Sequence, residues 1–177
     1  MIARSNKLLT QVRDKMVAAG INAEIVSKSQ DFASPPIQMM YYSMKLANAP
    51  ESRSLLNKLC SATSLVDGKM LSAEDVMAKA RVEGVTPLRA FFSLIAERNT
   101  LNSLATLGFS LLCDSLDHMS FALESINMFD VLNQADGVGE AFPDYDDDKA
   151  NWERIADQIQ RAHGYNVSLH LFLQEMD

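Results

Sequence analysis

The sequence predicts a mainly α-helical protein, folded as a single-domain bundle of six to seven helices. Apolar residues recur at intervals of three and four over most of the chain, and serine, proline and glycine stand where such stretches begin and end. Residues 100–129 are apolar on nearly every side of a helix, which is typical of a helix surrounded by others. We therefore expect residues 100–129 at the centre of one domain that spans residues 1–177.

The first two helices are delimited by glycine and proline. An apolar stripe over residues 8–19 stops at Gly20, and glycine readily adopts the left-handed conformation that ends many helices. Residues 34–36, Ser-Pro-Pro, predict the start of a second helix, because proline is tolerated in a first turn, and Pro50 ends that segment. The buried face of the second helix is predicted to comprise Ile37, Met40, Tyr41 and Met44.

Three more helices are predicted before residue 100. The third buries Leu55, Leu56, Leu59 and Cys60. Ser72 gives the clearest start signal in the chain, with Asp75 three residues later as its capping partner, and Gly84 closes this fourth helix. Residues 86–87, Thr-Pro, begin a fifth helix. Its buried stripe is predicted to comprise Leu88, Phe91, Phe92 and Ile95.

Near the C-terminus, one helix is clear and one segment is ambiguous. After a loop at residues 136–143, an amphipathic helix runs to Gly164. Its apolar side is predicted to align Trp152, Ile155, Ala156, Ile159 and His163. Residues 165–173 alternate polar and apolar side chains as a strand does, and in that interpretation they could pair with residues 21–26 in a minimal two-stranded sheet. The same segment also fits a helix that aligns Leu169, Phe172, Leu173 and Met176.

The net charge of −7 is concentrated at the C-terminal end. Residues 136–177 contain ten acidic and three basic side chains, a balance of −7, whereas residues 1–135 contain thirteen of each sign. Such a polarised charge distribution attracts a basic partner and repels nucleic acid. We therefore expect this acidic part to dock onto a basic protein. The residues predicted to bind that partner are Asp144, Asp146, Asp147, Asp148, Glu153 and Asp157.

The acidic run at residues 144–148 has two other interpretations. Its alternating aspartates resemble a calcium loop, but Lys149 stands where an EF-hand needs glycine and Ile155 where it needs glutamate, which leaves only an improvised cation site. Aspartates in the first turn of a helix also stabilise that helix through its dipole, without any ligand. The sequence leaves open whether the run meets a partner, a cation or solvent.

A second constellation interrupts the apolar segment at residues 100–129. Four polar residues at helical spacing could form an enzyme or metal site inside a bundle: Asp114, Asp117, His118 and Glu124. Di-iron bundles require Glu-x-x-His, which the sequence lacks, and the nucleophile and phosphate-loop motifs are also missing. The leading hypothesis is therefore a non-catalytic protein of inhibitor, immunity or regulatory type, with no metal and no cofactor. A homo-oligomeric assembly protein is a further alternative.

Three features indicate a soluble cytoplasmic protein. The N-terminus lacks a continuous apolar secretion signal, and the uncharged stretch at residues 100–113 is shorter than the roughly 20 residues that span a bilayer. Cys60 and Cys113 sit among apolar residues without neighbouring metal ligands, which favours buried free thiols. Basic residues alternate with acidic ones before residue 136, so no stripe for nucleic acid stands out. We expect neither direct nucleic-acid binding nor membrane binding.

Overall fold

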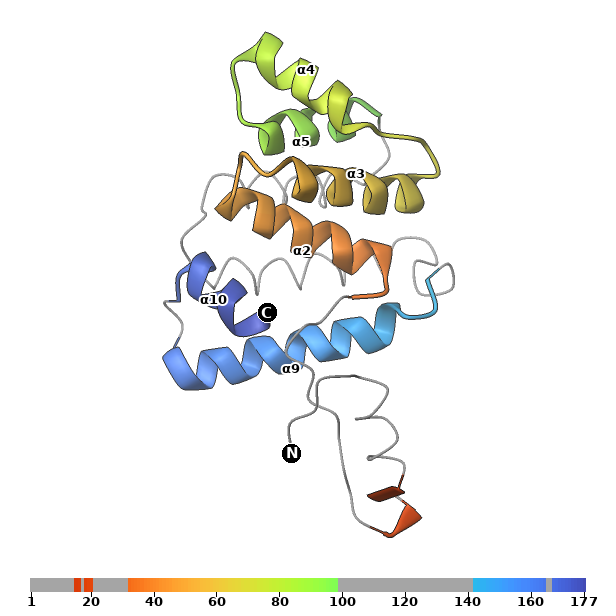
Figure 1. Cartoon of the computed structure of the whole chain (residues 1–177), viewed down its shortest axis with the longest axis vertical. Coiled ribbons are helices and arrows are strands. Elements are labelled where there is room, and N and C mark those ends of the chain that lie inside the picture. Colours follow the sequence, from red (N-terminus) through yellow and green to blue (C-terminus); the bar gives the residue numbers. More distant parts are fainter. Residues whose placement is uncertain (1–14, 17, 21–31, 99–141, 165–166) are drawn as a thin grey trace. The chain divides into compact units, whose positions relative to one another are not determined.

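A computed structural model describes residues 15, 16, 18–20, 32–98, 142–164 and 167–177 (Figure 1). Of these residues, 77% are helical and none lies in a strand, so the mainly α-helical fold is confirmed. The predicted central helix at residues 100–129 and the predicted strand at residues 21–26 lie outside the described residues. Within the described ranges, no helix combines the length and apolarity needed to cross a membrane.

The chain divides into two compact units. The first comprises residues 1–30 with 176–177, and the second comprises residues 31–175. In the first unit, Gly20 follows a few helical residues and has a φ of 75°, as predicted for a glycine that ends a helix. Helices α2 to α10 belong to the second unit, except for Met176 at the end of α10.

Helix α2 spans Pro35–Asn48 and begins where the sequence predicts. Ser34 is its N-cap, and the two prolines occupy the first helical positions, where a missing N–H leaves no hydrogen bond unmade. The Ser34 carbonyl accepts a hydrogen bond from the Gln38 N–H at 2.9 Å. The predicted apolar face is confirmed as buried, and it also includes Met39 and Leu46: Ile37, Met39, Met40, Tyr41, Met44 and Leu46.

Three helices follow in chain order: α3 (Arg53–Asp67), α4 (Ala73–Glu83) and α5 (Pro87–Arg98). Ser72 Oγ accepts a hydrogen bond from the Asp75 N–H at 3.1 Å, and Gly84 ends α4 with a φ of 66°, both as predicted. Leu55 is partly exposed rather than buried. The other apolar residues predicted for α3 and α5 are confirmed as buried: Leu56, Leu59, Cys60, Leu88, Phe91, Phe92 and Ile95.

The last two helices are α9 (Tyr145–His163) and α10 (Leu169–Met176). In α9 the predicted apolar side is buried except for His163, which is exposed at the helix end, with its Nε2 3.9 Å from Glu175 Oε1. Helix α10 corrects the strand interpretation of residues 165–173, because residues 169–173 are helical. Phe172 is fully buried, whereas Leu171 is only partly buried. The helix interpretation predicts that Phe172 is the more buried of the two, and the strand interpretation predicts the reverse.

Helix α2 lies between the other helices of its unit and contacts α3, α5 and α9 (Figure 1). Aromatic side chains join α2, α9 and α10 where they meet. The Phe32 ring centroid lies 5.3 Å from that of Tyr41 and 5.5 Å from that of Trp152, and Trp152 lies 5.9 Å from Phe172. Edge-on and tilted pairs at these separations are favourable beyond the burial of their area. This cluster fixes the rotation of α9 about its own axis and so determines which residues of α9 face outward.

Candidate functional site

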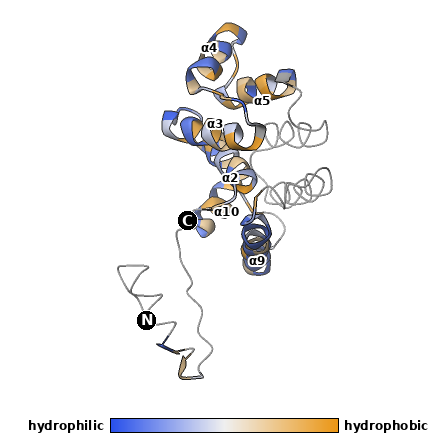
Figure 2. Cartoon of the chain, turned by 90° about the vertical axis from the view of Figure 1, so that its right-hand side faces the viewer, coloured by the Kyte–Doolittle hydropathy of each residue, from blue (hydrophilic) through white to orange (hydrophobic). Residues whose placement is uncertain are grey.

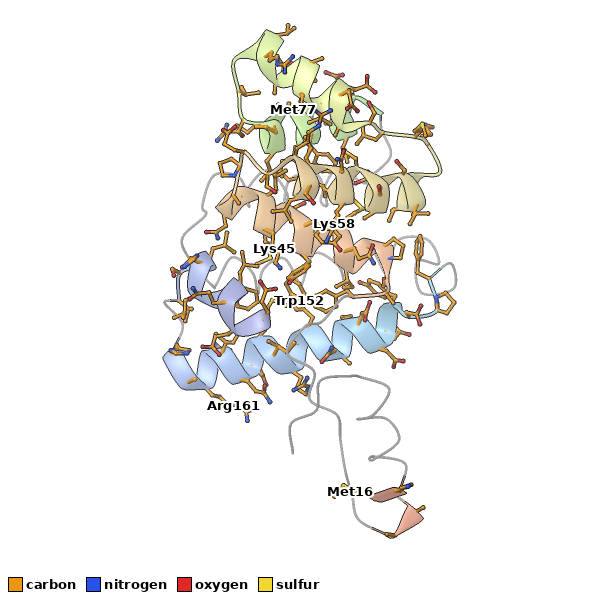
Figure 3. The ribbon with its side chains drawn as sticks, in the orientation of Figure 1. Met16, Lys45, Lys58, Met77, Trp152 and Arg161 are labelled. Atoms are coloured by element: carbon orange, nitrogen blue, oxygen red, sulfur yellow. The ribbon has the colours of Figure 1, made fainter. Side chains whose placement is uncertain are left out.

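Helix α9 has a buried side and a charged outer side. Tyr145, Trp152 and Ala156 are almost fully buried, and Ile155 and Ile159 lie with them. Figure 3 shows Trp152 on the side of α9 toward α2, whereas Arg161 projects away from the helices. Most of the helix is hydrophilic in Figure 2. Successive residues are rotated by about 100° around a helix. Residues of α9 that lie opposite the buried ones therefore face outward.

Three acidic residues lie in one line along this outer side. Asp146, Glu153 and Asp157 are separated by seven and by four residues, which places them above one another on a helix, and all three are exposed. We call these three residues the acidic stripe. Burial is the main cause that raises the pKa of the Tyr145 hydroxyl, and the charges of Asp146 and Glu153 raise it further. Two members of the stripe therefore act on the same neighbouring group.

Asp144 and Asp147 add negative charge at the start of α9. Asp144 occupies the N-cap position, although its side chain accepts no capping hydrogen bond, and Asp147 lies in the first turn. Both are exposed. Carboxylates at these positions interact favourably with the N-terminal end of the helix dipole. They extend the negative surface beyond the acidic stripe to the beginning of the helix.

Little of this charge is neutralised within the described structure. Asp157 Oδ2 lies 3.2 Å from Arg161 Nη2, and both side chains are mostly exposed. In the part of the chain that the structure describes, the other four outer acids form no ion pair: Asp144, Asp146, Asp147 and Glu153. Arg154 donates to Asn151 Oδ1 at 2.7 Å and to Gln158 Oε1 at 3.4 Å rather than to a carboxylate.

Asp148 differs from the other five predicted site residues. Its Oδ2 accepts a hydrogen bond from the Ser34 N–H at 2.6 Å, and the Ala33 N–H also hydrogen-bonds to the carboxylate. Burial raises the pKa of the Asp148 carboxyl above its ordinary value, although these two N–H groups act in the opposite direction. Asp148 therefore binds the backbone in front of α2 and is turned away from the outer side. Sequence reasoning missed this role, because 114 residues separate the partners.

The alternative site falls elsewhere in the chain. Four residues of that site lie outside the described residues: Asp114, Asp117, His118 and Glu124. Residues 136–141 of the predicted loop also lie outside them. Among the described residues, no group of three His, Cys, Asp or Glu side chains is arranged to hold a metal ion. Cys60 is buried, as the sequence predicts, and it forms no disulfide with a described residue.

Comparisons with family models, with curated proteins and with solved structures give no significant match.

Proposed function

We propose that the protein is a non-catalytic cytoplasmic binding protein, of inhibitor, immunity or regulatory type, that docks onto a basic protein partner through the outer side of α9. The surface consists of the acidic stripe together with the two exposed aspartates at the helix start. Asp148 is left out, because its carboxylate is engaged by the backbone of Ala33 and Ser34.

The observation that carries the proposal is the unneutralised charge of a rigidly held helix face. Trp152 is 1% exposed and Ile159 4%, so the buried side holds α9 in place. Of the five outer acids, only Asp157 pairs with a described basic residue. A fixed row of carboxylates requires little reorganisation on binding, which favours association with complementary lysine and arginine side chains.

This surface would act mainly on the rate of association. Uncompensated surface charge steers an oppositely charged partner during diffusion, and the resulting rate falls steeply as salt screens the field. Rim charges of this kind change the association rate and its salt dependence more than the dissociation rate. The partner would carry a cluster of lysine and arginine residues, and nucleic acid would be repelled.

The proposal is tested with two variants of equal net charge. The first neutralises the acidic stripe with Asp146→Asn, Glu153→Gln and Asp157→Asn. The matched control neutralises three exposed acids around α3 and α4, with Glu51→Gln, Glu74→Gln and Glu83→Gln. Proteins captured from native lysate by the wild type and by each variant are compared by mass spectrometry, and the association rate of each captured protein is measured at several salt concentrations.

We expect the stripe variant to lose a basic captured protein that the control variant retains. For that protein, the stripe variant should associate about tenfold or more slowly at low salt, with a flatter salt dependence. Equal capture by both triple variants would contradict the proposal, because net charge rather than the α9 surface would then govern binding. Loss of an acidic or neutral protein alone would also contradict it.

A further inference from the structure

Residues 32–34 are a short non-helical connection that enters the second unit just after its boundary at residue 31. We call these three residues the strap. Its first anchor is the Phe32 ring, which is 3% exposed and packs against Tyr41 and Trp152. Its second is the hydrogen bond from the Ser34 N–H to Asp148 Oδ2. The Gln38 side chain also donates from Nε2 to the Phe32 carbonyl.

The same place holds polar groups that are poorly satisfied. Ser34 Oγ and Trp152 Nε1 are each buried and have no hydrogen-bond partner in the described structure. Asp148, one helical turn before Trp152, holds a carboxylate whose pKa is raised by burial. Buried polar groups are nearly always hydrogen-bonded in folded proteins, and one without a partner is destabilised because it has given up water.

Opening the strap would therefore have compensating effects. It would expose the Phe32 ring and break the hydrogen bonds that anchor residues 32–34. It would also let water reach Ser34 Oγ, Trp152 Nε1 and the Asp148 carboxylate. A segment that is held by few contacts, and whose polar groups regain water on opening, opens locally at a lower free-energy cost than global unfolding. The helices themselves need not separate, because Trp152 keeps its contact with Phe172 and α2 keeps its contacts with α3 and α5.

We propose that the strap is a releasable clasp, in which Phe32–Ser34 detach from Trp152 and Asp148 in a local opening distinct from global unfolding. Opening adds a sixth carboxylate and an indole N–H to the surface of α9. The clasp rests on the contacts of residues 32–34 and is independent of the docking function proposed for the acidic stripe.

Hydrogen exchange of the full-length wild-type protein tests the clasp without any substitution. The Ser34 amide is compared with the amides of Ile155 and Ala156, which are buried in α9, by NMR at several low urea concentrations. We expect the Ser34 amide to exchange about tenfold or more faster, with a weaker dependence on urea, because local opening exposes less surface. If Ser34 exchanges at the same rate and with the same urea dependence as the α9 amides, the clasp does not exist.

Variants then test the part played by Asp148. Asp148→Ala removes the acceptor and should speed Ser34 exchange about tenfold or more, whereas Asp148→Asn keeps a side-chain oxygen and should retain most of the protection. Asp147→Ala, an exposed neighbour in the same turn, is the control and should leave Ser34 unchanged. Trp152 is the chain's one tryptophan, so acrylamide quenching of its fluorescence should increase only in Asp148→Ala. Equal exchange and quenching in the wild type, Asp148→Ala and Asp147→Ala would overturn the assignment of Asp148 to the clasp.

Discussion

Asp148 shows how a single side chain in an acidic run can take a role that its neighbours do not share. Asp146 and Asp147 point outward, yet Asp148 accepts hydrogen bonds from the backbone that precedes α2. Ser34 makes no capping bond with its own side chain, so the carboxylate of a distant helix supplies negative charge at the start of α2. The bonds do not fully offset the loss of water, because the pKa of the Asp148 carboxyl remains raised.

We expect Asp148→Asn to be more stable than the wild type at neutral pH. A carboxyl with a raised pKa in the folded state favours folding while it is protonated, and this contribution is lost as pH rises from the ordinary value of 3.8 through the raised value. The uncharged asparagine does not titrate. Urea unfolding over a pH series should therefore show the variant's advantage above this window and its disappearance below pH 3.8.

The control for this experiment is Asp147→Asn, which removes the same charge from an exposed position. It should not reproduce the gain in stability, because Asp147 is exposed and its carboxylate stays in contact with water in the folded protein. A wild type that is more stable than Asp148→Asn at neutral pH would contradict the prediction. In that case the charged hydrogen bond would outweigh the desolvation of the carboxylate.

At the scale of elements, the helix boundaries agree with the sequence wherever local signals mark them. Ser34 and Ser72 precede α2 and α4 as N-caps, and Gly84 ends α4 as predicted. These signals act within a few residues, so they are readable without the fold. The sequence leaves residues 165–173 open between strand and helix, because so short a segment fits both the two-residue period of a strand and the 3.6-residue period of a helix. Which of its side chains are buried depends on helices that are distant in the sequence. In the structure, Trp152 of α9 contacts Phe172, which places Phe172 on the buried side of α10.

Substitutions in α10 distinguish the two interpretations in solution. Phe172 is fully buried against Trp152, so Phe172→Ala should reduce the free energy of unfolding by about 3–5 kcal/mol. Leu171 is only partly buried, so Leu171→Ala should have a clearly smaller effect. Urea unfolding of the two variants measures both. The opposite order would indicate that Leu169, Leu171 and Leu173 share the buried face, as they do in a strand.

Across the whole molecule, the net negative charge is confined to the C-terminal segment, residues 136–177. The C-terminal segment carries the whole net charge, and the structure places much of it on the outer side of one helix. That side is available because the aromatic cluster around Trp152 occupies the other side. The prediction of a single domain over residues 1–177 stays a prediction, since the chain also divides into two units.

Unfolding experiments test the single-domain prediction. Trp152 reports only on the second unit, whereas far-UV circular dichroism reports on helices throughout the chain. If residues 1–177 unfold as one cooperative domain, urea transitions followed by tryptophan fluorescence and by circular dichroism should coincide. If part of the circular dichroism signal is instead lost at urea concentrations where the fluorescence does not change, the two units unfold independently.

Local sequence patterns correctly predict the helical class, the boundaries of α2 and α4, the start of α5 and the position of the negative charge. Each of these depends on residues close together in the chain, through capping, periodicity and composition. Contacts between distant segments set the helical state of residues 169–173, the inward role of Asp148 and the outward line of the acidic stripe. These depend on contacts between segments far apart in the chain, such as the 114 residues between Ser34 and Asp148, and local patterns carry no record of such contacts.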